Sequence, residues 1–200
     1  RVGDIKYVDR NGAGVISYEQ DRGYVGAAAY PKFVGGLSFS GDWKGIDLSF
    51  LFQAGLGRDV ALTGVYSGGI MDNTQMTKPF YHGGNSPKYL VENSWREDNT
   101  NAEFPRLSIV QASSNNAYSS TFWYRSGDYL RLKNLQIGYT FPQKWMSRIG
   151  IDRLRIYFEG QNLWTVSELT KFNIDPEQPG VSNGYYPQQR IFSFGVNLAF

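Results

Sequence analysis

The chain ends in Arg190-Ile-Phe-Ser-Phe-Gly-Val-Asn-Leu-Ala-Phe200, and this segment carries the strongest signal of secondary structure in the sequence. In an extended strand the side chains alternate between two faces, so every second residue lies on the same side. One face here is wholly apolar and the other is small or polar: Phe192, Phe194, Val196, Leu198 and Phe200 against Ser193, Gly195, Asn197 and Ala199. This alternation is typical of a sheet that covers a soluble core, or of a barrel strand between lipid and a polar lumen.

Four further stretches alternate in the same way, at about 32–42, 46–55, 129–141 and 152–162. In the third of them the apolar phase changes between Leu132 and Leu135, which predicts a β-bulge near Lys133 and Asn134. Each stretch is close to the roughly 9–11 residues that a tilted membrane strand needs. With the terminal strand at 190–200, they predict five antiparallel strands.

The connections between these stretches alternate between short and long. The turns near 43–45 and 142–151 are short, whereas the connections 57–128 and 163–189 are long. Outer-membrane barrels have short periplasmic turns and longer extracellular loops, and a soluble domain rarely holds so long a connection with little periodicity. The prediction is an all-β fold: the last five antiparallel strands of a large transmembrane β-barrel, in region 32–200, after an extracellular loop at 1–31.

The remaining strands are expected to come from sequence upstream, because the smallest known barrels have about eight strands. The chain begins at Arg1 without a Met or a signal-peptide pattern, so we interpret it as a piece of a longer protein.

Composition supports a β-rich membrane protein and argues against several functions. Of the 200 residues 16% are aromatic and 23 are glycine, as in barrels with aromatic girdles. The net charge of +2 gives no electrostatic support for nucleic-acid binding, and the absence of cysteine excludes disulfides and Cys-ligated metals. Trp43, Trp145 and Trp164 lie near strand ends, where indole rings anchor at a membrane interface.

The segment Asp9-Arg-Asn-Gly-Ala-Gly-Val-Ile-Ser17 resembles an EF-hand calcium loop with Gly14 at the sharp turn. The match is degenerate, because Ala13 occupies the fifth position and Gln20 the twelfth, where calcium loops carry oxygen ligands. We favour a turn that keeps only the shape of the loop. The alternative is a Ca²⁺ site whose candidate ligands are Asp9, Asn11, Val15 and Asp21.

No arrangement of residues predicts an enzyme. His82 is the only histidine, so these residues offer no multi-His zinc site and no further histidine as a base for a serine nucleophile. Acid pairs such as Glu97-Asp98 and Asp175-Pro-Glu177 are interpreted as solvated loop acids rather than as a glycosidase pair.

Charged residues share the face opposite the apolar one, with Arg131 and Lys133 in the third strand and Arg153, Arg155 and Glu159 in the fourth. A wet lumen is favoured over the solvated outer face of a soluble sheet, because the opposite faces are so uniformly apolar. The long loops carry aromatic residues that we predict to contact substrate or a partner protein. The candidates are Tyr66, Tyr81, Trp95, Trp123 and Tyr185. For Trp95 and Trp123, packing within the loop is the favoured alternative.

An ordered set of short motifs runs along the whole chain. It comprises Gly3-Asp-Ile-Lys-Tyr7, Tyr30-Pro-Lys-Phe33, Trp43-Lys-Gly-Ile-Asp-Leu-Ser49, Asn93-Ser-Trp95, Ser126-Gly-Asp-Tyr-Leu-Arg-Leu-Lys-Asn-Leu-Gln-Ile-Gly-Tyr-Thr-Phe-Pro142, Gly160-Gln-Asn-Leu-Trp-Thr165, Asp175-Pro-Glu177 and Tyr186-Pro-Gln188. In this set the chain resembles the carboxy-terminal part of the SusC/RagA group of TonB-dependent outer-membrane transporters of Bacteroidota.

That resemblance implies a many-stranded barrel plugged by an amino-terminal domain. It also implies a SusD-like surface lipoprotein as a lid and uptake of oligosaccharides or peptides across the outer membrane of a Gram-negative bacterium. The TonB–ExbB–ExbD complex would supply the energy through residues upstream of this chain. Relatives of this kind commonly carry Asp where this chain has Ala13, which again weakens the calcium alternative.

Two other classes of protein stay open at this point. One is a soluble carbohydrate-binding β-sandwich that would use the same loop aromatics. The other is an outer-membrane barrel enzyme, such as a lipase or protease, against which the single histidine argues. The sequence leaves the substrate, the lid protein and the oligomeric state open.

Overall fold

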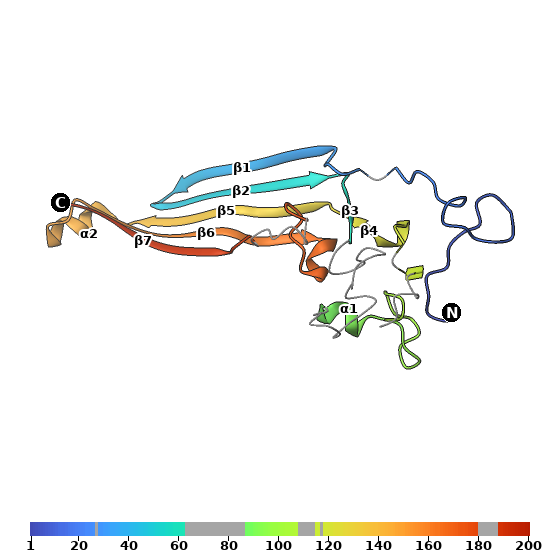
Figure 1. The fold of residues 1–200 in the computed structure, drawn as a ribbon. Helices are drawn as coiled ribbons and strands as arrows, with labels where there is room; N and C mark the ends of the chain where they lie inside the picture. The colour runs from blue at the N-terminus through green and yellow to red at the C-terminus, as the bar shows by residue number, and fades with distance from the viewer. Residues whose placement is uncertain (27, 63–86, 108–114, 117, 180–187) are drawn as a thin grey trace. The chain divides into compact units, whose positions relative to one another are not determined.

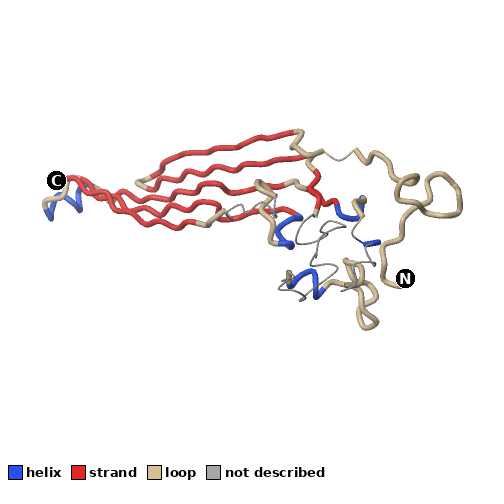
Figure 2. The backbone as a smooth tube through the Cα atoms, in the orientation of Figure 1, coloured by secondary structure: helices blue, strands red, loops and turns tan. Residues whose placement is uncertain are grey.

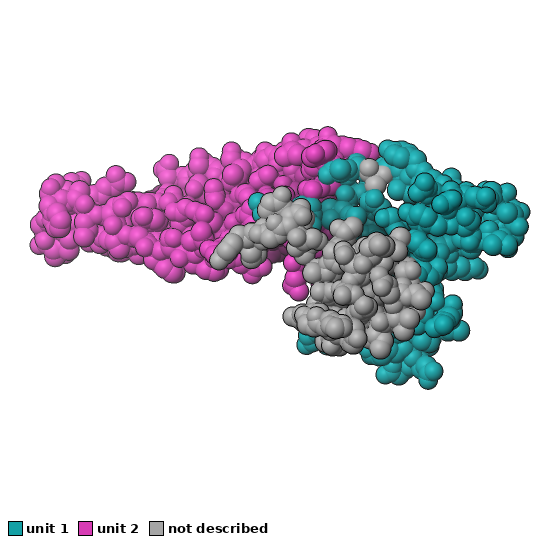
Figure 3. Space-filling model, viewed as in Figure 1, with its two compact units in different colours: residues 1–29, 59–125, 178–185 teal, residues 30–58, 126–177, 186–200 magenta. Residues whose placement is uncertain are grey.

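The structure is a computed structural model that describes residues 1–26, 28–62, 87–107, 115–116, 118–179 and 188–200. The chain divides into two compact units (Figure 3). The sheet unit comprises residues 30–58, 126–177 and 186–200, and the loop unit comprises residues 1–29, 59–125 and 178–185.

The sheet unit is built on one five-stranded antiparallel sheet (Figures 1 and 2). Its strands, in spatial order, are β1 (Phe33–Trp43), β2 (Ile46–Leu56), β5 (Tyr129–Thr140), β6 (Arg153–Ser167) and β7 (Ile191–Ala199). All neighbours pair antiparallel. The prediction of five antiparallel strands is confirmed.

A β-bulge interrupts the sheet where the apolar phase of β5 changes. Towards β2, Asn134 faces Leu51 and Leu132 faces Phe52, so Lys133 is the extra residue. The predicted bulge is confirmed. It lets the apolar residues on both sides of Lys133 stay on one face of the sheet.

β6 is longer than expected. The sequence predicted its end at 162, but the strand continues through Ser167 and is followed by the 3₁₀ helix η4 (Glu168–Phe172). Asn162 has a φ of 52°, a left-handed conformation that asparagine tolerates better than most residues. It opens a second bulge, after which Trp164 pairs with Leu132 and the strand resumes. The prediction of a loop at 163–189 is therefore wrong for residues 163–167.

One face of the sheet is apolar and exposed. Leu37, Phe52, Leu132 and Trp164 form one register row across four strands. Phe194 on β7 is 82% exposed. Within the described residues no second layer covers this face, whereas the inner faces of a β-sandwich bury each other. The exposure therefore disagrees with the β-sandwich alternative.

The short connections lie at one end of the sheet. The β1–β2 turn uses Lys44 and Gly45, both with positive φ. A Cβ on Gly45 would lie 2.6 Å from the carbonyl oxygen of Thr140, so only glycine fits there. β5 and β6 are joined at the same end by α2 (Gln143–Met146) and the 3₁₀ helix η3 (Ser147–Ile149), near the end of β7 (Figure 1). Exposed Trp43 ends β1 and exposed Trp145 lies in α2, both at this end of the sheet, as an interface anchor requires.

The loop unit has a small core of its own. It contains α1 (Lys88–Glu92) and the 3₁₀ helix η2 (Thr121–Trp123), and its buried side chains include Leu62, Leu90, Phe104 and Trp123. Two short strands, β3 (Asp59–Ala61) and β4 (Tyr124–Ser126), pair with each other. No helix among the described residues is both long and apolar enough to cross a membrane.

Candidate functional site: the polar face of the sheet

The face opposite the apolar one carries charged, amide and hydroxyl side chains, and we call it the polar face. In its middle, one register row carries polar side chains on all five strands: Ser40, Ser49, Gln136, Glu159 and Ser193. A cleft of about 420 Å³ opens among the first four of them. Such a surface can hydrogen-bond to a polar ligand or protein segment in many positions.

An ion pair spans three strands near the turn end of the polar face. The guanidinium of Arg155 on β6 donates to Asp47 on β2, from Nε to Oδ2 at 2.9 Å and from Nη2 to Oδ1 at 2.5 Å. Residue 138 on the intervening β5 is glycine, and a Cβ there would lie 2.4 Å from Asp47 Oδ2 and 2.5 Å from Arg155 Nη2. The bidentate pair therefore requires a residue without a side chain beneath it.

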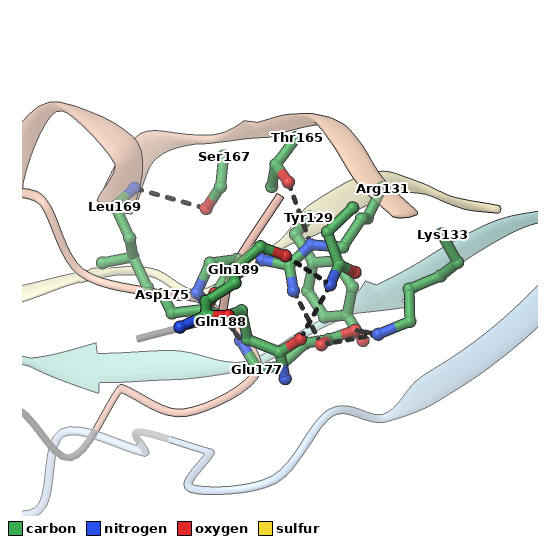
Figure 4. Close-up of polar contacts among 12 residues, drawn as sticks. Tyr129, Arg131, Lys133, Thr165, Ser167, Leu169, Asp175, Glu177, Gln188 and Gln189 are labelled. Carbon is green, nitrogen blue, oxygen red and sulfur yellow. Dashed lines mark hydrogen bonds and ion pairs between the residues drawn. The ribbon is translucent and has the colours of Figure 1, made fainter. Parts of the chain in front are cut away.

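A larger ionic cluster lies towards the other end of β5 (Figure 4). Arg131 is 3% exposed, and it donates to Asp175 Oδ2 at 2.9 Å and to Glu177 Oε2 at 2.8 Å. Its Nε donates to Thr165 Oγ1 on β6 at 2.9 Å. Burial of a guanidinium is tolerated only when its charge and donors are matched in this way.

The same cluster holds the segment that follows η4. Lys133, the bulge residue, donates to Glu177 Oε2 at 3.0 Å, and Arg58 Nη1 donates to the carbonyl oxygen of Pro176 at 3.3 Å. The backbone N–H of Glu177 donates to Asp175 Oδ1 at 2.9 Å, which closes the Asp-Pro-Glu turn. The turn is thereby fixed to the polar face by three cationic side chains.

This cluster corrects one expectation from the sequence. Asp175 and Glu177 were interpreted as solvated loop acids, but both are paired with buried or half-buried cations. Sequence reasoning also missed Thr165 and the partnership of Asp47 with Arg155. The available signal was that all the charges in the strands fell on one face, so a partner across the sheet was to be expected.

The predicted loop aromatics fall into two groups. Tyr66, Tyr81 and Tyr185, together with His82, lie outside the described residues. Trp123 is 2% exposed, its ring packs 6.0 Å from that of Phe104, and its Nε1 donates to the carbonyl oxygen of Asn116. Half-buried Trp95 packs its ring over Gly3. This arrangement of Trp123 is that of a core residue and agrees with the alternative in which it packs within the loop.

The 9–21 loop is closed by its own carboxylates. Asp9 Oδ1 and Oδ2 accept hydrogen bonds from the backbone N–H groups of Gly12 and Gly14, both at 2.7 Å. Asp21 Oδ1 accepts from the N–H of Arg10 at 2.8 Å, and its Oδ2 accepts from that of Ser17 at 2.6 Å.

These bonds decide how well the loop suits a cation. Hydrogen bonds from the backbone N–H groups of Ser17 and Arg10 hold the pKa of Asp21 below its ordinary value. Asn11 Oδ1 accepts from the N–H of Ala13 at 2.8 Å, and Val15 would have only its carbonyl oxygen to offer. The described residues contain no group of three or more His, Cys, Asp or Glu side chains that could hold a metal. The side chains of Asp9, Asn11 and Asp21 thus already accept backbone N–H groups, and Ala13 supplies no side-chain oxygen at the fifth position of the loop.

The comparisons with known proteins agree with this architecture. No protein-family model matches the chain. The chain is 29% identical over 97% of its length to "TonB-dependent receptor P3" of Formosa agariphila, and 26% identical over 97% of its length to "TonB-dependent receptor SusC" of Bacteroides thetaiotaomicron. It spans about a fifth of the length of these relatives, 19% and 17% respectively.

Solved structures give the same result. The chain is similar to the RagAB peptide importer in its open-open state, with a TM-score of 0.60 and 26% identity over 97% of this chain and 20% of that one. A second structure, of the RagAB peptide transporter, matches with a TM-score of 0.54 and 26% identity over 87% of this chain and 18% of that one.

The sheet, with one lipid-compatible face and one ion-paired polar face, is a segment of a larger membrane β-barrel. The resemblance to the carboxy-terminal part of the SusC/RagA group of TonB-dependent transporters is confirmed over essentially the whole chain.

Proposed function

We propose that the full-length protein takes up oligosaccharide or peptide nutrients across the outer membrane of a Gram-negative bacterium of the Bacteroidota. The five described strands would form part of the barrel wall, with the apolar face against lipid and the polar face towards the lumen. The observation that carries this proposal is the exposed apolar face of the sheet, since a soluble protein rarely leaves so large an apolar surface uncovered.

The names of the relatives and of the structural neighbours support the proposed substrate class. One relative is named SusC, and the structural neighbours are described as a peptide transporter and a peptide importer. Both kinds of substrate are larger than solutes that diffuse through porins, so we propose a gated transporter whose opening needs energy. We propose that the TonB–ExbB–ExbD complex supplies it through residues outside this chain.

We further propose a SusD-like lipoprotein as partner. Its contacts would come from the segments that we place outside the cell, namely 1–31, 57–128 and the part of 163–189 that follows η4. No residue in this proposal makes or breaks a covalent bond in the substrate, so the function is transport rather than catalysis.

Uptake by whole cells tests the proposal. Cells with the intact gene are expected to accumulate a labelled oligosaccharide or peptide, and cells without the gene, or without TonB, are expected to lose that accumulation. The protein should fractionate with outer membranes and require detergent for extraction. A protein that stays in solution without detergent, or uptake that is indifferent to TonB, would contradict the proposal.

The partner is tested separately by affinity purification of the full-length protein from detergent-solubilised membranes. A surface lipoprotein is expected to co-purify in about equal amount. Purification without any lipoprotein would remove the partner from the proposal and leave the transport function standing.

A further inference from the structure

The loop unit contains a cleft to which none of the roles described above assigns an organic ligand. It has a volume of about 710 Å³, within the usual range of small-ligand sites, and it opens between residues 5–25 and residues 115–122. Its lining mixes apolar side chains, hydroxyl groups and cations.

The charge of this lining is one-sided. Lys6, Arg10 and Arg22 line the cleft, and Asp21 is the one carboxylate among its described lining residues. Both oxygens of Asp21 accept hydrogen bonds from backbone N–H groups of the 9–21 loop, at 2.6 to 2.8 Å for the two shortest. That carboxylate is thus engaged in closing the loop, and the cleft presents an excess of positive charge.

Arg22 is held in place by a row of tyrosine rings. Its guanidinium carbon lies 5.3 Å from the centroid of the Tyr18 ring, a cation–π distance. Tyr18 stacks on Tyr118, with ring centroids 4.7 Å apart and an angle of 24° between the planes. Tyr7 meets Tyr118 edge to face at 6.3 Å. A guanidinium beside a ring can still present its fork of N–H groups to the two oxygens of a carboxylate.

The cleft also offers hydroxyl groups. Burial, the largest cause, raises the pKa of Tyr7 to about 12, and its protonated phenol donates to the backbone carbonyl oxygen of Asn115, so its oxygen can only accept from a ligand. Ser17, Ser119 and Thr121 add further hydroxyls to the lining. Apolar side chains of Ile5, Ile16 and Phe122 complete the walls and can cover a ring or an alkyl group of the ligand.

We propose that this cleft binds a carboxylate-bearing ligand of oligomer size, with Arg22 as the residue that recognises the carboxylate. The ligand is an acidic oligosaccharide or an acidic peptide, whose shared chemistry is an ionised carboxylate beside a less polar body. The inference rests on the proposed function, in which residues 1–31 lie outside the cell. It gives that function a selective site for acidic substrate.

Equilibrium binding to the purified full-length protein in detergent tests this inference. Trigalacturonic acid and its neutral methyl ester represent the oligosaccharide. An amino-acetylated tripeptide that contains Glu, and its Gln-containing counterpart with an amidated carboxy-terminus and no carboxylate, represent the peptide. At least one acidic probe is expected to bind at least about tenfold more tightly than its neutral counterpart, because a charge-assisted pair is lost in the latter. The probe that binds identifies the source of the carboxylate.

Substitutions localise the binding to the cleft. Arg22→Gln is expected to lower the affinity for the acidic probe by about tenfold or more. Arg22→Lys should lower that affinity less, because lysine keeps the charge but not the planar fork. Lys88→Gln removes one charge from α1, outside the cleft, and should bind as the unsubstituted protein does. If Arg22→Gln fails to fold, Lys6→Gln at an exposed position of the cleft carries the test, with a severalfold weakening expected.

Two outcomes would overturn the inference. One is equal affinity for acidic and neutral probes, and the other is unchanged affinity in the Arg22 variants. Either outcome leaves the uptake assay of the full-length protein untouched, so a failure of the cleft is distinguishable from a failure of the transport proposal.

Discussion

Position 138 has to be free of a side chain because an ion pair occupies the space above it. The carboxylate of Asp47 and the guanidinium of Arg155 meet over β5, and both lie within 2.6 Å of where a Cβ on Gly138 would be. The same device recurs at Gly195, where a Cβ would lie 2.1 Å from the ring of Tyr157. On the polar face, glycines thus make room for the large side chains of neighbouring strands.

Gly138→Ala is expected to separate the two partners and to destabilise the folded barrel by about 1–3 kcal/mol, the usual range for a lost charge-assisted pair. The measurement is the temperature at which the full-length protein in detergent loses its folded, slowly unfolding form. Gly41→Ala is a matched control, because its Cβ would meet only the ring of Phe39 at 3.2 Å. Equal effects of the two substitutions would contradict the role of the ion pair.

Asp21 provides a pH test of the 9–21 loop. Its pKa lies below the ordinary value of about 3.8, because its ionised form accepts the N–H groups of Ser17 and Arg10. This stabilisation of the loop is complete above the ordinary pKa and is lost as the pH falls through the lower pKa of the folded state.

A spin label on Val15→Cys, an exposed position of this loop, reports the effect. Its mobility should stay constant from pH 7 to about pH 5 and rise only well below the ordinary pKa of an Asp carboxyl. Asp21→Asn should raise the mobility of the label already at pH 7. Adding Ca²⁺ or a chelator should leave this mobility unchanged, and a calcium-dependent decrease in mobility would favour the cation site at Asp9, Asn11, Val15 and Asp21.

Among the elements, β5 does most to organise the polar face. Its bulge at Lys133 keeps apolar residues on one face despite the change of phase, and it places Arg131 and Lys133 towards the Asp-Pro-Glu turn. This Asp-Pro-Glu turn lies at the end of the segment that follows β6 and η4. An element read as loop from sequence is therefore fixed by a strand distant in the chain.

Arg131→Gln is expected to release this segment, because two carboxylates lose a buried partner, a change that costs about 3–5 kcal/mol. Backbone hydrogen exchange of residues 168–177 in the full-length protein should accelerate strongly. Arg153→Gln is the control, since Arg153 also lies on the polar face but is exposed. Unchanged exchange in Arg131→Gln would show that the segment is held by its apolar residues Leu169 and Phe172 alone.

For the whole molecule, the two faces of the sheet predict opposite responses to the same substitution. Phe194 and Ser193 are neighbours on β7 but lie on the apolar and the polar face. If the apolar face contacts lipid, placing an arginine on it costs free energy, because the charge loses its hydration. An arginine on the polar face stays hydrated and lies opposite Glu159 in the paired position.

Phe194→Arg is therefore expected to destabilise the barrel by about 2–4 kcal/mol, the range for a cation deep on the lipid face. Ser193→Arg should be nearly neutral. The yield of folded, heat-resistant protein in outer membranes measures both. A result in which Ser193→Arg is the more damaging variant would assign the faces the other way round.

Much of this fold could be read from the chain, and the reason is physical. The period of two along a strand is a local property, so the five strands and the bulge near Lys133 follow from neighbouring residues alone. The end of β6 was missed because Asn162 looks like a terminus in sequence, whereas in the sheet it only opens a bulge. The partners of Arg131 were missed because they lie some forty residues away, at |i−j| of 44 and 46.

The order of residues along the chain was enough to predict strands with one apolar and one polar face, because alternation depends only on neighbouring residues. The folded chain was needed to show which charges neutralise each other and that a cationic cleft forms between residues 5–25 and 115–122. These features depend on distances between segments far apart in the chain, and only the folded backbone sets those distances.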